Sequence, residues 1–446
     1  MIWFFDVYKD STTRVSKDTA GGYGTENLLG NGLFTRIAET MIKRGVFWPN
    51  LGFMHSFNEV TNLGYQARFE KVVVKPSNAC LAEINPETDV VFVCASLVCF
   101  ETELDFCSQV LNKYPNAKIC LLGQISIELI EFINEKISVI GGNYEFIFAN
   151  KLELVLLLQQ LSNQRVVKKS DSINFYPLTA INWSLFGGGF SNKLFTSKKN
   201  YPYLASRGCP YSCIEYCSYP VAQGRKVLRV PIEKVLSDLS HIASFDPNGH
   251  VIFRDPVFSI QPNTTLELLD AISAANLGLT YTAEIHLKNC SDELISAFNK
   301  AGFTHLKFGI ESSSDYVRNA ASRYSVSNDE QQKIVEKLKE AKITTDGMFI
   351  LGLPDDNNET VNATISYACD LGLDFAQFSI FTPYPGTKKY AEMTNLMTNN
   401  RFEQLSQFKL QFRHKVFNQN QLDSLLYKAY KKFYLSKALG LLRMLR

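Results

Sequence analysis

Strand-like and helix-like segments alternate along most of this chain, and that alternation restricts the possible folds more than any other feature. Beyond residue 200 the pattern repeats six times, with strand-like segments at 202–206, 250–255, 279–285, 305–311, 344–352 and 375–382. Amphipathic helical segments separate these strands. Strands that alternate with helices form parallel sheets, and six units are too few to close an eight-fold barrel. This half of the chain therefore predicts a partial (β/α)6 barrel of the TIM type.

The first half carries a less regular form of the same alternation. Strands are expected at 2–7, 71–75, 89–96, 117–123, 138–142 and 145–149, with helices at 33–44, 101–114, from about 126 and at 151–161. The run from 89 to 96 is continuously apolar, which suits a strand buried on both faces. The pattern predicts an α/β fold whose N-terminal part is a doubly wound, Rossmann-like parallel sheet.

A loss of periodicity divides the chain. Regular patterns fail over 163–200, which contains three consecutive glycines at 187–189, so a linker is expected between an N-terminal domain at 1–162 and a core domain at 201–392. A helical tail follows at 393–446. Parallel sheets bind ligands beyond the carboxyl ends of their strands, which brings Ser96, Gly123 and Gly141 near any site in the first domain. The alternative is that these small residues only form tight turns.

Charge and hydropathy exclude several classes of partner. The 46 Lys and Arg residues nearly balance the 44 Asp and Glu residues, so no nucleic-acid partner is expected. The longest apolar run, at 90–100, is too short to cross a bilayer, and the N-terminus lacks the basic leader of a signal peptide. Most cysteines are scattered through apolar segments without a disulfide framework. We therefore expect a cytoplasmic protein with reduced, buried thiols.

Three cysteines depart from this scatter, because Cys209, Cys213 and Cys217 fall within the stretch SRGCPYSCIEYCSYP. A buried helical stripe would explain the spacing, but Gly208 and Pro210 flank the first cysteine. Zinc sites usually have four ligands, and no fourth Cys or His is close in sequence. A disulfide would leave one thiol over. An iron–sulfur cluster held by three thiolates keeps one iron open to a second molecule, and this interpretation is favoured.

At this point the sequence resembles a known family, the radical S-adenosylmethionine (SAM) enzymes. The cysteine stretch is similar to the family's cluster loop, although the spacing here is C-x3-C-x3-C rather than C-x3-C-x2-C, with one residue inserted at Ile214 or Glu215. Five further segments are similar to successive strand ends of the family's barrel: FRDPVF (253–258), TAEIHL (282–287), FGIESSSDYVRNAASR (308–323), GMFILGLPDDNNET (347–360) and FTPYPGTKKY (381–390).

The resemblance implies a chemistry and a set of contacts. A 4Fe-4S cluster on the three cysteines would chelate SAM through its open iron, and one electron would cleave SAM to a 5′-deoxyadenosyl radical. Glu284 and Glu311 would contact the SAM ribose or amino group, with Ser313 beside them, and Gly352 would let the backbone approach the adenine. Each of these residues has an alternative as an ordinary strand-end or turn residue. An electron donor such as flavodoxin or ferredoxin is also implied.

The whole chain resembles the branch of this family that has an N-terminal cobalamin (B12)-binding domain. In that branch Ser96, Gly123 and Gly141 would lie near the cobalamin nucleotide tail. The D-x-H-x-x-G motif that supplies a histidine ligand to cobalt is absent. The function implied is radical SAM catalysis with cobalamin-dependent methyl transfer to an unactivated carbon. The alternatives are a cobalamin-independent rearrangement or oxidation enzyme, or a degenerate, non-catalytic member that binds zinc.

The C-terminal segment bears on the substrate. Residues 427–446 carry six Lys and Arg residues and no acidic residue, interleaved with leucines and aromatics. Such a segment is typical of an amphipathic basic helix. It would either pack on the barrel or make peripheral contact with an anionic membrane. A small-molecule or a lipid-linked substrate is therefore expected.

Overall fold

The computed structural model describes residues 1–9, 15–17, 25–26, 50–73, 81, 83–85, 89–115, 117–123, 144–148, 180–186, 190–191, 198–399 and 401–444. The helices expected at 33–44, from 126 and at 151–161, the strand expected at 138–142 and most of the expected linker lie outside these residues. None of the described helices combines the length and the apolar character that a membrane crossing requires.

The N-terminal sheet has five described strands in the order β4-β1-β5-β6-β7, and all neighbouring pairs are parallel. Their bounds are β1 Ile2–Tyr8, β4 Ala67–Val73, β5 Val90–Cys94, β6 Lys118–Gly123 and β7 Tyr144–Phe148. The chain adds β4 on one side of β1 and β5 on the other, so the strand order reverses between β1 and β5. Ligands of open α/β sheets bind at such a switch point.

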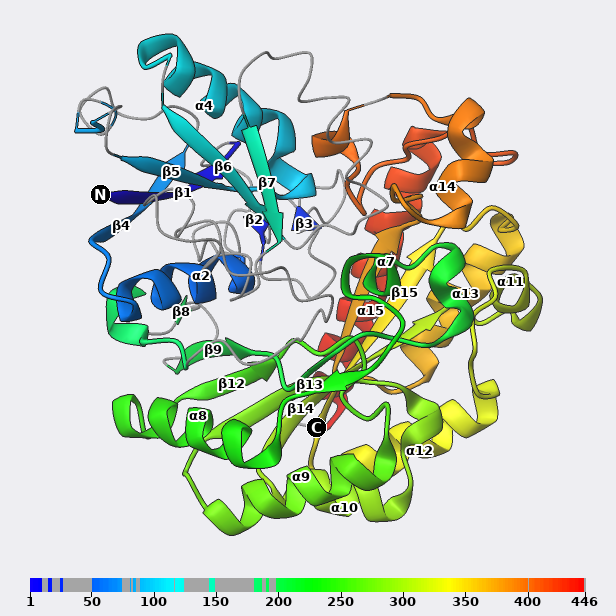
Figure 1. Cartoon of the computed structure of the whole chain (residues 1–446). Helices are drawn as coiled ribbons and strands as arrows, with labels where there is room; N and C mark the ends of the chain where they lie inside the picture. Colours follow the sequence, from blue (N-terminus) through cyan, green and yellow to red (C-terminus); the bar gives the residue numbers. More distant parts are fainter. Residues whose placement is uncertain are drawn as a thin grey trace.

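Successive residues of β1 pack alternately into two different cores. Trp3 and Phe5 face α4 (Phe100–Lys113), whereas Phe4 packs against Phe53 and Phe57 of α2 (Leu51–Asn62). Side chains of a strand point alternately to the two faces, so both faces of this sheet are covered by helices (Figure 1). The expected doubly wound architecture is confirmed. Helix α2 was not expected from the sequence.

The second sheet has the order β16-β15-β14-β13-β12-β9-β8, and its six longer strands run parallel. These strands are β9 Lys199–Tyr203, β12 His250–Phe253, β13 Thr280–Ile285, β14 Phe303–Glu311, β15 Thr344–Leu351 and β16 Phe375–Ile380. The short β8 (Phe190–Ser191) pairs with β9 in the antiparallel direction. The expected partial (β/α)6 barrel is confirmed.

Helices cover the outer face of this curved sheet, as Figure 1 shows. They are α8 Ile232–Phe245, α9 Pro262–Ala275, α10 Asp292–Lys300, α12 Asn328–Glu340 and α13 Asn358–Asp370. Their apolar sides share one core with alternate strand residues such as Ala283, Leu306 and Phe349. Since these residues face outward, their neighbours along each strand face the interior of the barrel.

The C-terminal tail closes the barrel and reaches the N-terminal sheet. The helix α15 (Gln419–Met444) packs on β16, where Tyr430 Oη donates to the Phe378 carbonyl oxygen at 2.9 Å. Upstream, the Glu101 carboxylate accepts from the backbone N–H groups of Phe402 (2.8 Å) and Glu403 (3.0 Å). The tail therefore joins both sheets. Membrane contact through α15 stays a prediction.

Candidate active site

The cysteine loop leaves the carboxyl end of β9 and is held by a short antiparallel pair, β10 (Ser206–Arg207) with β11 (Leu228–Arg229). Gly208 has a φ of +90°, and a Cβ atom there would lie 2.0 Å from the Lys226 carbonyl oxygen. Only glycine fits this close approach. The N–H of Cys209 then donates to the Gly224 carbonyl oxygen at 3.0 Å, which closes the loop.

The structure brings the three cysteines together on this loop. Cys213 lies in the short 3-10 turn η3 (Ser212–Glu215), and its carbonyl oxygen accepts from Cys217 N–H at 2.8 Å, just before α7 (Ser218–Gln223). A hydrogen bond from the Cys217 thiol, with help from the positive charge of Arg323, lowers the pKa of Cys213 to about 7. Burial raises the pKa of the Cys209 thiol to about 11. The three sulfurs are thus close enough to affect one another's ionisation.

Three thiols on one loop are a donor set that suits an iron–sulfur cluster. In a four-iron cluster each thiolate bonds a different iron, so three thiolates leave one iron open. Three neighbouring thiols, with the guanidinium of Arg323 beside them to offset thiolate charge, fit such a cluster.

A buried carboxylate supports the first residues of the loop. Asp255, just beyond β12, accepts a hydrogen bond from Ser206 Oγ at 2.5 Å and another from the Ala205 N–H at 3.1 Å. Asp255 is 1% exposed, and burial raises its pKa to about 6. The strand end of β12 thereby holds the segment that leads into Cys209.

Both carboxylates expected to contact SAM lie beside the cysteine loop. Glu284, in β13, accepts from the hydroxyl of Tyr219 at 2.9 Å, two residues beyond the last cysteine, and its other oxygen lies 3.6 Å from Arg254 Nη1. Glu311 ends β14 after an irregular register and has a φ of +67°, unusual for a residue with a side chain. Its Oε1 lies 3.4 Å from Arg323 Nε.

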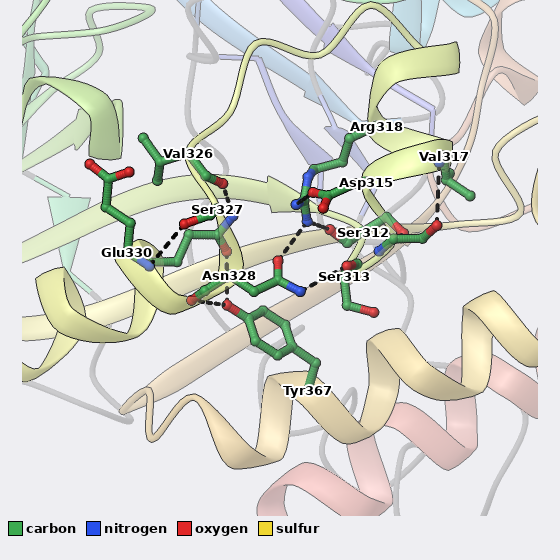
Figure 2. Close-up of polar contacts among 12 residues, drawn as sticks. Ser312, Ser313, Asp315, Val317, Arg318, Val326, Ser327, Asn328, Glu330 and Tyr367 are labelled. Atoms are coloured by element: carbon green, nitrogen blue, oxygen red, sulfur yellow. Dashed lines mark hydrogen bonds and ion pairs between the residues drawn. The ribbon is translucent and has the colours of Figure 1, made fainter.

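Ser313 lies in the turn after Glu311, within a dense polar network (Figure 2). Arg318, in α11 (Asp315–Ala320), donates to the Ser312 carbonyl oxygen at 2.5 Å and to Asn328 Oδ1 at 2.9 Å. Asn328 Nδ2 in turn donates to the Ser313 carbonyl oxygen at 2.9 Å. The Ser313 N–H donates to Thr364 Oγ1 at 3.1 Å. The network fixes the backbone of this turn, so it also fixes the position of Glu311.

Gly352 follows β15 with a φ of +73°, and a Cβ atom there would lie 3.0 Å from a methyl group of Leu422 in α15. The close approach that requires glycine is therefore made by the tail helix. The neighbouring Leu353 and Pro354 line a small pocket together with Tyr216 and Phe381. This pocket connects the cysteine loop with the ends of β15 and β16.

Two of the three residues expected to contact cobalamin, Ser96 and Gly123, lie at the carboxyl edge of the N-terminal sheet. Ser96 follows β5 and is fully buried. Its N–H and its hydroxyl both donate to the Glu103 carboxylate at 2.7 Å, and this carboxylate also pairs with Lys17 at 2.7 Å. Gly123 ends the adjacent β6, in register with Phe148 of β7. Gly141 lies outside the described residues. Cobalamin contact at these positions stays a prediction.

The carboxyl edge of the N-terminal sheet packs on the rim that carries the cysteines. Leu97 and Phe100, which follow β5, share one apolar cluster with Val221 and Ala222 of α7 and with Tyr384 beyond β16. Helix α7 begins directly after Cys217. The carboxyl edges of the two sheets, where ligands are expected to bind (the ligand edges), are therefore neighbours.

Sequence reasoning missed the cationic partners of the two carboxylates. Arg254 lies within FRDPVF (253–258) and Arg323 ends FGIESSSDYVRNAASR (308–323), two segments that resemble the family, so their positions were a usable signal. The hydroxyl of Tyr219 had no such signal. His286, which follows β13, has both ring nitrogens engaged, with Nε2 at 2.8 Å from the Tyr324 carbonyl oxygen and Nδ1 at 3.2 Å from the Lys288 nitrogen.

Comparison with known proteins shows what part of this chain is similar to. Residues 203–368 match the model of the Radical SAM superfamily. An uncharacterized methyltransferase of Pyrococcus horikoshii is 30% identical over 234 residues, which cover 52% of this chain and 50% of that protein. Bacteriochlorophyllide d C-12(1)-methyltransferase of Chlorobaculum tepidum is 25% identical over 241 residues, covering 53% and 52%. The chain thus spans about half the length of these relatives.

Solved structures share the fold at low sequence identity. The radical SAM methyltransferase TsrM of Kitasatospora setae, with cobalamin and a 4Fe-4S cluster bound, is 12% identical with a TM-score of 0.59, over 88% of this chain and 74% of that one. The cobalamin-dependent radical SAM enzyme OxsB, with aqua-cobalamin bound, is 12% identical with a TM-score of 0.58, over 88% and 55%. The cysteine loop and most of the partial barrel lie within residues 203–368, and this part of the chain is similar to the radical SAM superfamily, whose members use a 4Fe-4S cluster and SAM.

Proposed function

We propose that this protein is a radical SAM enzyme that transfers a methyl group to an unactivated carbon with the help of cobalamin. The observation that carries the proposal is the contact between the two ligand edges. Leu97 and Phe100, which follow β5, share one apolar cluster with Val221 and Ala222 of α7, the helix that begins directly after Cys217. A corrinoid at the first edge would therefore stand close to a cluster at the second.

The residues of the loop have distinct tasks in this proposal. Cys209, Cys213 and Cys217 would hold the cluster, and Gly208 and Asp255 keep the loop in the required shape. When bound, the cluster would supply the electron that cleaves SAM, and cobalamin would carry the methyl group. Glu284 and Glu311 would accept hydrogen bonds from the SAM ribose or ammonium group, because carboxylates bind such donors strongly.

A cation lies beside each of the two carboxylates and helps to orient it. Arg323 lies 3.4 Å from Glu311, and Arg254 lies 3.6 Å from Glu284. The Tyr219 hydroxyl holds the second oxygen of Glu284, which leaves this carboxylate with one face for a ligand. The aromatic and apolar residues around the loop, Tyr216, Leu353 and Phe381, exclude water from the space where a radical would form.

The comparisons support the cobalamin part of the proposal without supplying its residues. The relatives include proteins named as methyltransferases, and TsrM and OxsB are structures with cobalamin bound. Without the D-x-H-x-x-G motif, cobalamin would bind here through its nucleotide tail and the packing around its ring. Electrons would come from a small carrier such as flavodoxin or ferredoxin.

A second candidate is a radical SAM enzyme that works without cobalamin. One observation favours it: the hydroxyl and N–H of Ser96 are already used by Glu103, which in turn holds Lys17. These buried groups occupy the switch point between β1 and β5, where a nucleotide tail would enter. Cobalamin binding would then require the Ser96 donors to be released or the tail to take another path.

Equilibrium dialysis of the full-length protein against hydroxocobalamin separates the two candidates. The methyltransferase proposal expects retention with a Kd in the micromolar range or below, which corresponds to about −8 kcal/mol or better. The same protein, reconstituted anaerobically with iron and sulfide and then reduced, should cleave SAM. Cleavage of SAM without cobalamin retention would leave the second candidate. If the protein neither retains cobalamin nor cleaves SAM, a non-catalytic relative of the superfamily would remain as the interpretation.

A further inference from the structure

A row of alternating charges crosses the inner face of the barrel. Glu284 of β13 is in register with Lys307 of β14, and Lys307 is in register with Asp346 of β15. Arg254 extends the row at its other end, because it directly follows β12 and pairs with Glu284. Reading across the four strands, the charges are positive, negative, positive and negative, and their sum is zero.

This row faces the interior and starts at the cysteine loop. The residues that flank Glu284, Lys307 and Asp346 along their strands, such as Ala283, Leu306 and Thr345, are buried on the outer side. The row must therefore lie on the opposite face. Tyr219, two residues beyond the last cysteine, donates a hydrogen bond to Glu284, so the Arg254–Glu284 part of the row lies beside the cysteine loop. Lys307 and Asp346 lie further along the same face.

The charges of the row are largely buried and incompletely satisfied. The side chains of Glu284, Lys307 and Asp346 are 13%, 29% and 12% exposed. Lys307 Nζ lies 3.7 Å from Asp346 Oδ2, beyond hydrogen-bond distance. In the part of the chain that the structure describes, the other oxygen, Asp346 Oδ1, and the nearby His305 Nε2 are buried without a hydrogen-bond partner. A buried polar group without a partner is destabilising, so these two atoms are the ones in the row that are available to a ligand.

The charges of the row also restrict which ligand fits. An apolar ligand, such as the chain of a lipid-linked substrate, would bury these charges without satisfying them. A ligand with a net charge would leave an unmatched charge in a neutral row. A zwitterion can satisfy both Lys307 and Asp346. Neighbouring strands are about 5 Å apart, so one small molecule that carries both charges can lie between the two side chains and reach both.

We propose that Lys307 and Asp346 form the substrate subsite and that the substrate is a small zwitterion of the α-amino-acid class. The carboxylate of the ligand pairs with Lys307. Its ammonium group donates one hydrogen bond to Asp346 Oδ1 and another to His305 Nε2. This inference rests on the proposed function, because it assigns the substrate of that reaction. The amino-acid portion of SAM has the same chemistry, so the test must separate SAM from a second molecule.

Calorimetric titration of the reconstituted, unreduced full-length protein tests the proposal. Each standard L-amino acid is titrated singly, with and without excess SAM. We expect at least one to bind with a Kd below about 1 mM in the presence of SAM. The matching amine without a carboxylate, and the matching acid without an amine, should each bind at least about tenfold more weakly. Binding that occurs only without SAM would assign the row to SAM and overturn the proposal.

Variants show whether binding depends on the row. Asp346→Asn keeps the shape of the side chain and should weaken binding at least about tenfold, and Lys307→Met should do the same. The control is Lys337→Met, which removes a lysine from an exposed ion pair with Asp292 on the outer helices and should leave the affinity unchanged. Equal affinities in Asp346→Asn, Lys307→Met and the parent would overturn the assignment of the row.

Failure of this inference is distinguishable from failure of the proposed function. If the reduced parent protein cleaves SAM but binds none of the amino acids, the substrate class is wrong and the radical SAM activity stands. If it binds an amino acid through Lys307 and Asp346 but does not cleave SAM, the subsite stands and the proposed function is wrong.

Discussion

Gly208 permits a stringent test of the cysteine loop, because a second glycine of the same loop provides a matched control. Both residues have left-handed backbones, with φ values of +90° at Gly208 and +81° at Gly224. At Gly208 an added Cβ would lie 2.0 Å from the Lys226 carbonyl oxygen and 2.7 Å from its carbonyl carbon. At Gly224 an added Cβ would meet no atom within 4 Å. Alanine at each position therefore shares the conformational strain but not the collision.

The magnitudes follow from this difference. Gly224→Ala should lower the free energy of unfolding by about 1–3 kcal/mol, the cost of holding a side chain in that backbone region. Gly208→Ala carries a similar cost and adds about 1–3 kcal/mol, because the backbone of Lys226 must move. The displacement should also shift Cys209, so iron retention should fall in Gly208→Ala and stay near the parent value in Gly224→Ala.

Urea unfolding midpoints and the iron bound per chain after anaerobic reconstitution measure the two effects. Because the chain has two sheets with separate cores, the two variants are compared with each other rather than converted to absolute stabilities. If Gly208→Ala equalled Gly224→Ala in both the midpoint and the iron content, the argument that the Lys226 carbonyl shapes the cysteine loop would be refuted.

Three further predictions concern the loop, its support and the N-terminal sheet. Deleting Ile214 restores the usual family spacing, and iron content should be kept or increased; loss of iron would mean that the longer loop is a required geometry. Burial raises the pKa of Asp255 from 3.8 to about 6, so its contribution to stability is fully present below about pH 4 and is lost as the pH rises through 6. The free energy of unfolding should fall by at most about 3 kcal/mol between pH 4 and pH 6 for this reason. Asp255→Asn should reduce the slope of the urea midpoint against pH in that range, and an unchanged slope would contradict the raised pKa of Asp255. Gly123→Trp should abolish hydroxocobalamin retention in dialysis, whereas Leu63→Trp, at an exposed position of the same sheet region, should not; equal retention would place the tail elsewhere.

The order of strands and helices was predictable because it depends on local periodicity. The six barrel strands begin and end within a few residues of their expected bounds, and so does α4. Helix α2 was missed in a sequence, LGFMHSFNEVTN, whose apolar residues face two cores: Phe53 and Phe57 pack on the N-terminal sheet, whereas Leu51 and Met54 belong to the barrel core. Its start depends on a cap, Asn50 Oδ1, which accepts from the Phe53 N–H at 3.1 Å.

The positions of the candidate site residues were easier to predict than their partners. Cys209, Glu284 and Glu311 could be assigned to strand ends from the sequence, because parallel strands end at one edge. The pairing of Glu311 with Arg323 depends on a positive φ and an irregular register, which a sequence pattern does not show. The position of Ser96 was predictable as well. The two hydrogen bonds that Ser96 donates to Glu103 result from tertiary packing and were not predictable.

Reductive cleavage of SAM by cysteine variants tests the central claim most directly. Parent protein, Cys213→Ala and the control Cys290→Ala, which changes a free cysteine outside the loop, are reconstituted anaerobically, reduced and incubated with SAM. Iron content and the formation of 5′-deoxyadenosine are then measured in the same samples. If Cys209, Cys213 and Cys217 hold the cluster, Cys213→Ala should lose both iron and product, and Cys290→Ala should keep both. Cleavage of SAM by Cys213→Ala at the parent rate would contradict the account.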